Sequence, residues 1–205
     1  MVFITNKAIN VSRETDSQLA TYNALLHKWQ KAINIVSPST LNDSQQRHFV
    51  DSLQIASLIP KNTETLYDLG SGGGFPGMVL AIAAPQITVT LIESDRKKCS
   101  FLSNVSRETG IKANVCNERI EQTSLPAPDV ITARALADLE TLFTWCIDWA
   151  AQNPALTLLF PKGRTAQDEI AVAQQKFDFS YEVHPSIVSE ESCIIAVHKL
   201  QKRTA

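Results

Sequence analysis

A cluster of glycines directly after a short apolar stretch constrains the fold of this chain more than any other feature. Residues 65–77 read TLYDLGSGGGFPG, and an apolar pattern with helical spacing continues over residues 79–83. This order predicts a buried strand, a tight turn and the N-terminus of a helix. Glycines let the backbone take positive φ angles and approach a ligand closely. The segment is therefore typical of a site that holds a nucleotide-like ligand.

A second strand predicts the other half of such a site. Residues 87–92 read ITVTLI and are followed by Glu93, which lies 19 residues after Gly74. Because ligands of open α/β sheets bind at the carboxyl ends of the strands, we expect Glu93 beside the glycine turn. Its carboxylate would accept hydrogen bonds there from the two hydroxyls of a ribose.

The glycine spacing distinguishes between nucleotide-like cofactors. A dinucleotide fingerprint requires G-x-G-x-x-G, whereas this chain has Gly70-x-Gly72-x-Gly74, with Phe75 in the sixth position. No Gly-Lys-Ser/Thr follows, which excludes a phosphate-binding P-loop. Asp68, just before the turn, suits a ligand that carries an ammonium group. These features favour S-adenosylmethionine; NAD and a turn without any ligand are the alternatives.

The composition predicts an ordinary globular domain. Of 205 residues, 44% are hydrophobic and 20% are charged, which suffices for a full core. No apolar run approaches the roughly 20 residues that span a bilayer, and the N-terminal residues lack the apolar core of a signal peptide. We therefore expect a cytoplasmic monomer that does not enter a membrane. Four widely spaced cysteines and four scattered histidines predict no metal site.

The net charge of −2 at pH 7 argues against a surface that is basic throughout, as general nucleic-acid binding would favour. This net charge does not exclude local basic patches. The candidates to form them are residues 96–98, Lys162 with Arg164, and residues 199–203.

The chain begins with two predicted helices. Apolar residues at positions 19, 22, 26, 29 and 33 share one face of a helix expected from Ser12 to Ile35, with Ser12 or Asp16 as its cap. A second helix is expected over residues 44–58. We expect residues 1–60 to form a helical cap on a methyltransferase-like domain of residues 61–205, the two together forming a single folding unit.

From residue 66 onward, predicted strands and helices alternate, which indicates a mostly parallel sheet with helices on both faces. Two final strands without a helix between them predict an antiparallel hairpin. The predicted class is α/β, with the Rossmann-like seven-stranded sheet of S-adenosylmethionine-dependent methyltransferases. The strands are expected at 66–69, 87–92, 111–115, 129–133, 155–160, 178–184 and 192–199, and the helices at 77–84, 95–109, 119–123, 137–151 and 166–176.

Seven motifs in sequence order resemble the ribosomal RNA small-subunit methyltransferase G family. The glycine turn alone indicates a methyltransferase, and the RHxxDSL and TARA segments that flank it make the resemblance specific. The motifs cover about residues 30 to 165. They are Asn34-Ile-Val-Ser, Arg47-His48-x-x-Asp51-Ser52-Leu53, residues 68–77, Glu93-Ser94-Asp95-x-Lys-Lys, Arg119-Ile120-Glu121, Thr132-Ala-Arg134-Ala135 and Lys162-Gly163.

This resemblance implies transfer of a methyl group from S-adenosylmethionine to N7 of a guanine in small-subunit (16S) ribosomal RNA, within the ribosomal subunit. It also implies roles for particular side chains and for the turn that includes Gly72. Gly70 and Phe75 would line the cofactor pocket, and Arg134 would lie near the reacting methyl group. Glu93 stands where many members of this family carry Asp, a difference that preserves the carboxylate. The ribose and adenine region would comprise Glu93, Ser94, Asp95, Ile120 and Glu121.

The chemistry that this implies needs no general base, because guanine N7 carries a lone pair and no proton. The sequence agrees, since no His–Asp or Cys–His pair accompanies the cofactor motifs. Catalysis would then rest on positioning and electrostatics. Arg134 is the candidate catalytic residue, as a group that holds the methionine carboxylate or guanine O6. The alternative is a surface arginine in an ion pair.

Other candidates have a functional and a structural interpretation. Arg47 and His48, with Asp51 and Ser52, would either roof the pocket or touch RNA, or they would only anchor the N-terminal helices to the domain. Lys162 and Arg164 would either contact RNA phosphates or lie in a solvated loop. The same fold would also serve a methyltransferase of small molecules or proteins, or a non-catalytic RNA-binding scaffold.

Overall fold

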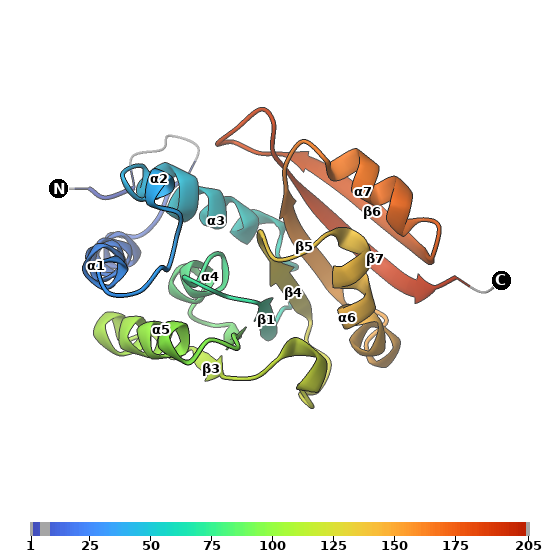
Figure 1. The fold of residues 1–205 in the computed structure, drawn as a ribbon, viewed down its shortest axis with the longest axis horizontal. Helices are drawn as coiled ribbons and strands as arrows, with labels where there is room; N and C mark the ends of the chain where they lie inside the picture. The colour runs from blue at the N-terminus through green and yellow to red at the C-terminus, as the bar shows by residue number, and fades with distance from the viewer. Residues whose placement is uncertain (1, 5–8, 204–205) are drawn as a thin grey trace.

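One seven-stranded sheet forms the centre of the molecule in the computed structural model, which describes residues 2–4 and 9–203 (Figure 1). The strand order is β3-β2-β1-β4-β5-β7-β6, and only β7 runs antiparallel to its neighbours. This confirms the predicted mostly parallel sheet and its closing hairpin. The strands are β1 (Thr65–Leu69), β2 (Thr88–Ile92), β3 (Asn114–Cys116), β4 (Val130–Ala133), β5 (Thr157–Lys162), β6 (Phe177–Pro185) and β7 (Cys193–Lys202).

The register brings the candidate site together at one edge of the sheet. Leu69, the last residue of β1, pairs with Ile92 at the end of β2 and with Ala133 at the end of β4. The residues that follow these three strands are the glycine turn, Glu93 and Arg134. Segments that are far apart in the sequence therefore converge where the strand order reverses, at the position where open α/β sheets bind ligands.

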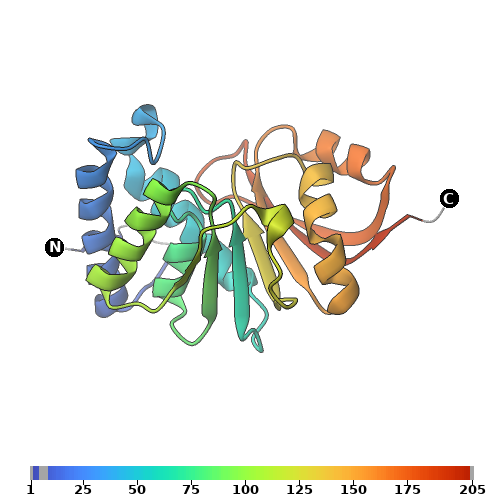
Figure 2. The same ribbon diagram turned by 60° about the horizontal axis from the view of Figure 1, so that its bottom comes forward.

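Helices cover both faces of the sheet (Figure 2). One apolar core packs α1, α4 and α5 on one face, and the other packs α6 and α7 on the opposite face. The helices and helical turns are α1 (Arg13–Gln30), α2 (Pro38–Leu41), η1 (Gln45–Val50), α3 (Asp51–Leu53), η2 (Gln54–Leu58), α4 (Gly77–Ala83), α5 (Arg96–Thr109), η3 (Ile120–Gln122), α6 (Leu139–Gln152) and α7 (Ala166–Ala173).

The N-terminal helices differ in detail from the prediction. Ser12 caps α1 as expected, since its side chain accepts a hydrogen bond from Thr15 N. The helix ends at Gln30 and does not continue to Ile35, because the Gln30 amide accepts from the N–H groups of Ile35 and Val36 and holds the chain in a turn. The segment over 45–58 is helical throughout but changes its winding from π-helix through α-helix to 3-10 helix.

The helical cap shares its core with the sheet domain. Leu19, Tyr22 and Leu26 of α1 are fully buried, in the same apolar cluster as Leu80 of α4 and Phe101 of α5. Part of the segment inspected for a signal peptide, residues 1 and 5–8, lies outside the described residues. Within residues 2–4 and 9–203, no helix is both long and apolar enough to cross a bilayer.

Candidate functional site

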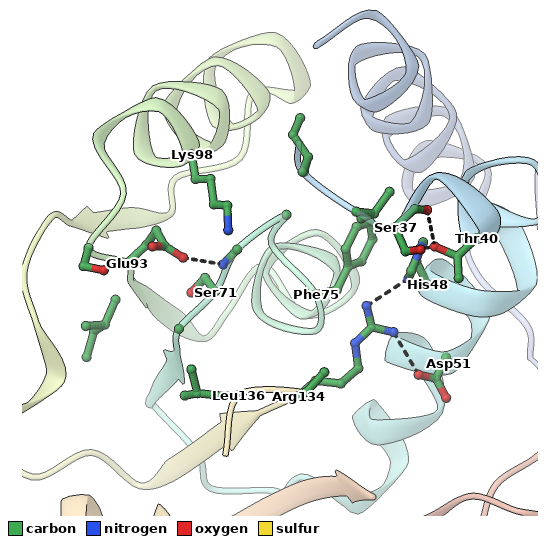
Figure 3. A pocket seen from close by; sticks show the side chains of 18 of the residues that line it. Ser37, Thr40, His48, Asp51, Ser71, Phe75, Glu93, Lys98, Arg134 and Leu136 are labelled. Carbon is green, nitrogen blue, oxygen red and sulfur yellow. Dashed lines mark hydrogen bonds and ion pairs between the residues drawn. The ribbon is translucent and has the colours of Figure 1, made fainter. Parts of the chain in front are cut away.

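A cavity of about 640 Å³ opens at the carboxyl edge of β1, β2 and β4, beneath the helical cap. Its size is typical of small-molecule sites. It collects ten of the residues singled out from the sequence, and Figure 3 shows several of them around the glycine turn. Those ten are Arg47, His48, Gly70, Gly72, Phe75, Glu93, Ser94, Ile120, Glu121 and Arg134.

The glycine turn provides an open backbone surface to this cavity. Gly70 and Gly72 have φ angles of +59° and +55°, which residues other than glycine rarely adopt. A Cβ at Gly70 would lie 2.5 Å from Leu136 Cδ1, so a side chain at this position would also displace Leu136. At Gly72, among the described residues beyond its chain neighbours, the only atom within 4 Å of such a Cβ would be Gly70 O, at 3.7 Å. The turn therefore leaves free space for a ligand directly above its backbone.

Glu93 fixes the turn from the neighbouring strand. Its side chain is buried, and its two carboxylate oxygens accept hydrogen bonds from Gly72 N and Asp95 N, both at 2.8 Å (Figure 3). Asn117 donates to the backbone oxygens of Glu93 and Ser94 and holds the end of β2 in place. Each carboxylate oxygen has a second acceptor site, so Glu93 can still accept from the hydroxyls of a ligand.

Two acids expected in the cofactor site lie elsewhere. Asp95 caps α5, accepting hydrogen bonds from Lys97 N and Lys98 N, and does not line the cavity. Asp68 is fully buried beneath the turn, packed against Gly77, and its Oδ1 accepts a hydrogen bond from Thr132 at 2.9 Å. Asp68 Oδ2 has no hydrogen-bond partner among the described residues, and burial raises the pKa of this carboxyl to about 6. Neither acid is placed to meet a ligand directly.

Arg134 lies at the end of β4, inside the cavity. Its guanidinium donates to Arg47 O at 3.0 Å, to Asp51 Oδ2 at 3.0 Å and to His48 Nδ1 at 2.9 Å, and it lies 5.4 Å from the Phe75 ring centroid. A guanidinium has five N–H donors. The other two have no partner among the described residues. Arg134 is thus both in an ion pair, as the structural alternative held, and able to bind a further acceptor in the cavity.

His48 is held as a neutral ring. Because Nδ1 accepts from Arg134, Nε2 carries the proton and donates to Thr40 Oγ1 at 2.9 Å. The ring stacks on Phe75 with centroids 4.9 Å apart. Burial, followed by the positive charges of Arg134 and Arg47, lowers the pKa of His48 to about 4. Both ring nitrogens are occupied, so His48 is not poised to take a proton from a substrate.

The expectations for Lys162 and Arg164 need revision. Both interpretations of Lys162 assumed an exposed ammonium, and the structure contradicts this. Its side chain is only 9% exposed, lies 2.7 Å from Glu169 Oε2 and donates to Ala137 O. The start of α7 places Glu169 opposite Lys162, which a local sequence pattern does not reveal. Arg164 is exposed and lies 3.5 Å from Glu191, outside the cavity lining.

Several cavity residues were not among the predicted site residues, although Lys98 was a candidate for a basic patch and Arg119 began a motif. Lys98 and Arg119 line the cavity and form no side-chain ion pair within the described part of the chain. The IVS stretch after Asn34 was noted as a motif, and its residues prove to line the cavity. The connection between β6 and β7 also contributes, through Val188, Ser189 and Ser192, and nothing local in the sequence indicates this. Among residues 2–4 and 9–203, no group of three or more His, Cys, Asp or Glu is arranged to hold a metal ion.

Known proteins with similar sequences share one description. A family model for rRNA small subunit methyltransferase G matches residues 15–195. Proteins named ribosomal RNA small subunit methyltransferase G are similar over nearly the whole chain. The one from Rhodospirillum centenum is 46% identical over 96% of this chain and 89% of its own length. The one from Sinorhizobium fredii is 43% identical over 97% of this chain and 95% of its own length.

Solved structures with the same fold are much more distant in sequence. A magnesium protoporphyrin IX methyltransferase from Synechocystis with bound S-adenosylmethionine superposes with a TM-score of 0.62 at 12% identity, over 95% of this chain and all of its own. A mitomycin 7-O-methyltransferase gives a TM-score of 0.62 at 12% identity, over 92% of this chain and 69% of its own. At these identities the likeness concerns the fold.

Proposed function

The chain belongs to the rRNA small subunit methyltransferase G family, and from this premise we propose that it methylates N7 of a guanine in small-subunit ribosomal RNA, with S-adenosylmethionine as methyl donor. The observation that carries the proposal is the convergence of the glycine turn, Glu93 and Arg134 on one cavity. We further propose that the protein acts as a cytoplasmic monomer on RNA within the ribosomal subunit.

The residues present fit this cofactor. The backbone at Gly72 leaves open space, and Glu93 offers a buried carboxylate for ribose hydroxyls. Ile120 and Glu121 line the same cavity and would border the adenine. When bound, the cofactor supplies a methyl group attached to a positively charged sulfur. The remaining contribution of the chain is to bind, orient and exclude water.

The site is built for positioning. His48, which lies beside Arg134, is not available as a general base, since both of its ring nitrogens are engaged. Guanine N7 needs none, and correct placement of two reactants can lower a barrier by as much as about 7–11 kcal/mol. Arg134 has two N–H groups left for the methionine carboxylate or guanine O6. Because Asp51 and His48 hold the guanidinium, little of its freedom remains to be lost on binding.

Lys98 and Arg119 are better placed than Lys162 to meet RNA phosphates. Both line the cavity, and in Figure 3 the Lys98 side chain extends toward the glycine turn. Because the net charge of −2 argues against a surface that is basic throughout, we expect the contacts with RNA phosphates to be concentrated at the opening of the cavity. Lys98→Ala should raise the KM for the RNA substrate and reduce the dependence of KM on salt, since each phosphate contact releases counterions. An unchanged salt dependence would remove Lys98 from the interface.

The proposed function is tested with radiolabelled S-adenosylmethionine and three substrates: small subunits, large subunits and naked ribosomal RNA. We expect label in small-subunit RNA, at one guanine that borohydride and aniline treatment then cleaves. Label in protein or small molecules would instead support a different methyltransferase, and no label in any fraction would support a binding scaffold.

A further inference from the structure

The connection between β6 and β7, residues 186–192, forms a wall of the cavity although it comes from the other end of the chain. Val188, Ser189 and Ser192 line the cavity, and Val188 packs on the apolar core of the helical cap. The hairpin end lies near the N-terminal helical segment in Figure 1. We call residues 186–192 the hairpin loop.

One buried side chain of the helical cap holds this loop. Gln54 Oε1 accepts a hydrogen bond from Ile187 N at 3.0 Å, and Gln54 Nε2 donates to Ser186 Oγ at 3.2 Å. Ser186 Oγ also accepts from Val188 N at 3.1 Å. Both polar ends of a single amide, 9% exposed, therefore fix two consecutive residues that lie more than 130 positions away in the sequence.

The same amide is joined to Arg134 through one carboxylate. Gln54 Nε2 donates to Asp51 Oδ1 at 2.9 Å, and Asp51 Oδ2 accepts from Arg134 at 3.0 Å. The relative placement of the hairpin loop and the Arg134 guanidinium is thus set by two adjacent side chains, Asp51 and Gln54. A loop that only closed the surface would not need a connection to the cavity arginine.

The wall that the loop provides suits a heterocyclic base. With the Glu93 side of the cavity assigned to the adenosine, the methyl acceptor must enter near Arg134. Ser189 and Ser192 carry hydroxyls that both donate and accept hydrogen bonds, and Val188 offers apolar surface.

We propose that the hairpin loop is the wall against which the target base is held, and that Gln54 is a positioning residue that fixes this wall relative to Arg134. This inference rests on the proposed function, since it takes the acceptor to be an RNA base.

The test compares Gln54→Leu, which keeps most of the side-chain volume, with Ser57→Ala. Ser57 is an exposed residue of the same helical turn, and among the described residues its side chain hydrogen-bonds to Gln54 O and to no residue of the loop. Three quantities are measured for each full-length variant: methyl transfer to small subunits, cofactor affinity by calorimetry, and hydrogen exchange of the Ile187 amide.

For Gln54→Leu we expect kcat/KM for small subunits to fall about tenfold, the effect of losing one to two hydrogen bonds. Cofactor affinity should stay within about twofold of wild type, and the Ile187 amide should exchange faster. Ser57→Ala should match wild type throughout. Adding Ser186→Ala to Gln54→Leu should cause a smaller loss than Ser186→Ala causes in the wild type, because the contact between Gln54 and Ser186 is then already broken.

Equal kinetics for Gln54→Leu and Ser57→Ala would overturn the inference, as would a loss of cofactor affinity as large as the loss of kcat/KM. Should Gln54→Leu fail to fold, Ser186→Ala alone removes the contacts of Ser186 Oγ with Gln54 and with Val188 N, and its kinetics decide in the same way. A wild-type protein that leaves small-subunit RNA unlabelled contradicts the proposed function itself. An active wild type with an unaffected variant contradicts only the role of Gln54.

Discussion

Replacing Glu93 by Gln should weaken cofactor binding and destabilise the fold at the same time. The two carboxylate oxygens of Glu93 accept from Gly72 N and Asp95 N, each at 2.8 Å, in a buried position. A glutamine keeps the shape of the side chain but has one acceptor oxygen and one NH₂ donor. One of the two backbone N–H groups would then face a donor and lose its partner.

The size of both effects follows from these contacts. An unsatisfied buried donor costs about 1–3 kcal/mol, and 1 kcal/mol corresponds to about 2–4 °C in Tm for a domain of this length. We therefore expect Tm to fall by roughly 2–12 °C. Hydrogen bonds from a ribose to a charged acceptor are worth about 1.5–3 kcal/mol, so cofactor affinity should fall at least about tenfold.

Thermal unfolding and calorimetric titration with S-adenosylmethionine measure the two effects separately. The control is Glu93→Asp, which keeps the acid that many family members carry here and should retain most of the affinity. If Glu93→Gln bound the cofactor as tightly as wild type, the assignment of Glu93 to the ribose would be refuted. An unchanged Tm would refute the stabilising role of its two backbone contacts.

Three further results are expected. Arg134→Ala should leave a folded protein that transfers methyl groups at least about a hundredfold more slowly to purified small subunits, since it removes the orienting group; near-normal turnover would exclude that role. His48 should contribute stability that is complete above about pH 6.5 and is lost toward about pH 4, at about 1.4 kcal/mol per pH unit, because the unfolded state binds a proton that the neutral buried ring does not. Buried Asp68, whose pKa is raised to about 6, makes the unfolding free energy change with pH in the opposite direction between about pH 4 and 6. The measurement is therefore the difference in unfolding free energy between wild type and His48→Gln as a function of pH. A difference that does not change with pH would contradict the role of His48. Finally, we propose that residues 1–60 and 61–205 unfold as one unit because they share a core, so fluorescence and circular dichroism should report the same urea midpoint; separate midpoints would show two units.

Local patterns in the sequence were sufficient to predict those parts of the fold and of the site that depend on local backbone geometry. The glycine turn and the acid after β2 could be placed because parallel strands bring their carboxyl ends to one edge. Ser12 could be identified as a helix cap because a cap requires only a side chain three residues before its partner. The alternation of predicted strands and helices likewise predicted the mostly parallel sheet.

Features that depend on particular side-chain contacts or on tertiary packing were not predictable in this way. Gln30 ends α1 through bonds to residues beyond the helix, against an apolar pattern that continues. Lys162 looked exposed until α7 placed Glu169 against it. Asp68 precedes the turn, and only the packing of Gly77 on its Cβ shows that it lies under the backbone and away from the cavity. The hairpin loop reaches the cavity through a contact across 133 residues.

The attachment of the hairpin loop to Gln54 has a consequence for protein synthesis. The cavity combines residues 35–51, residues at the edge of the sheet and residues 188–192, so the nascent chain lacks one wall until residue 192 has left the ribosome. Truncated translation products should accordingly be inert even when they contain the glycine turn. Conversely, two fragments divided at an exposed loop in the middle of the chain would each carry part of the site, and activity regained on mixing them would report their assembly.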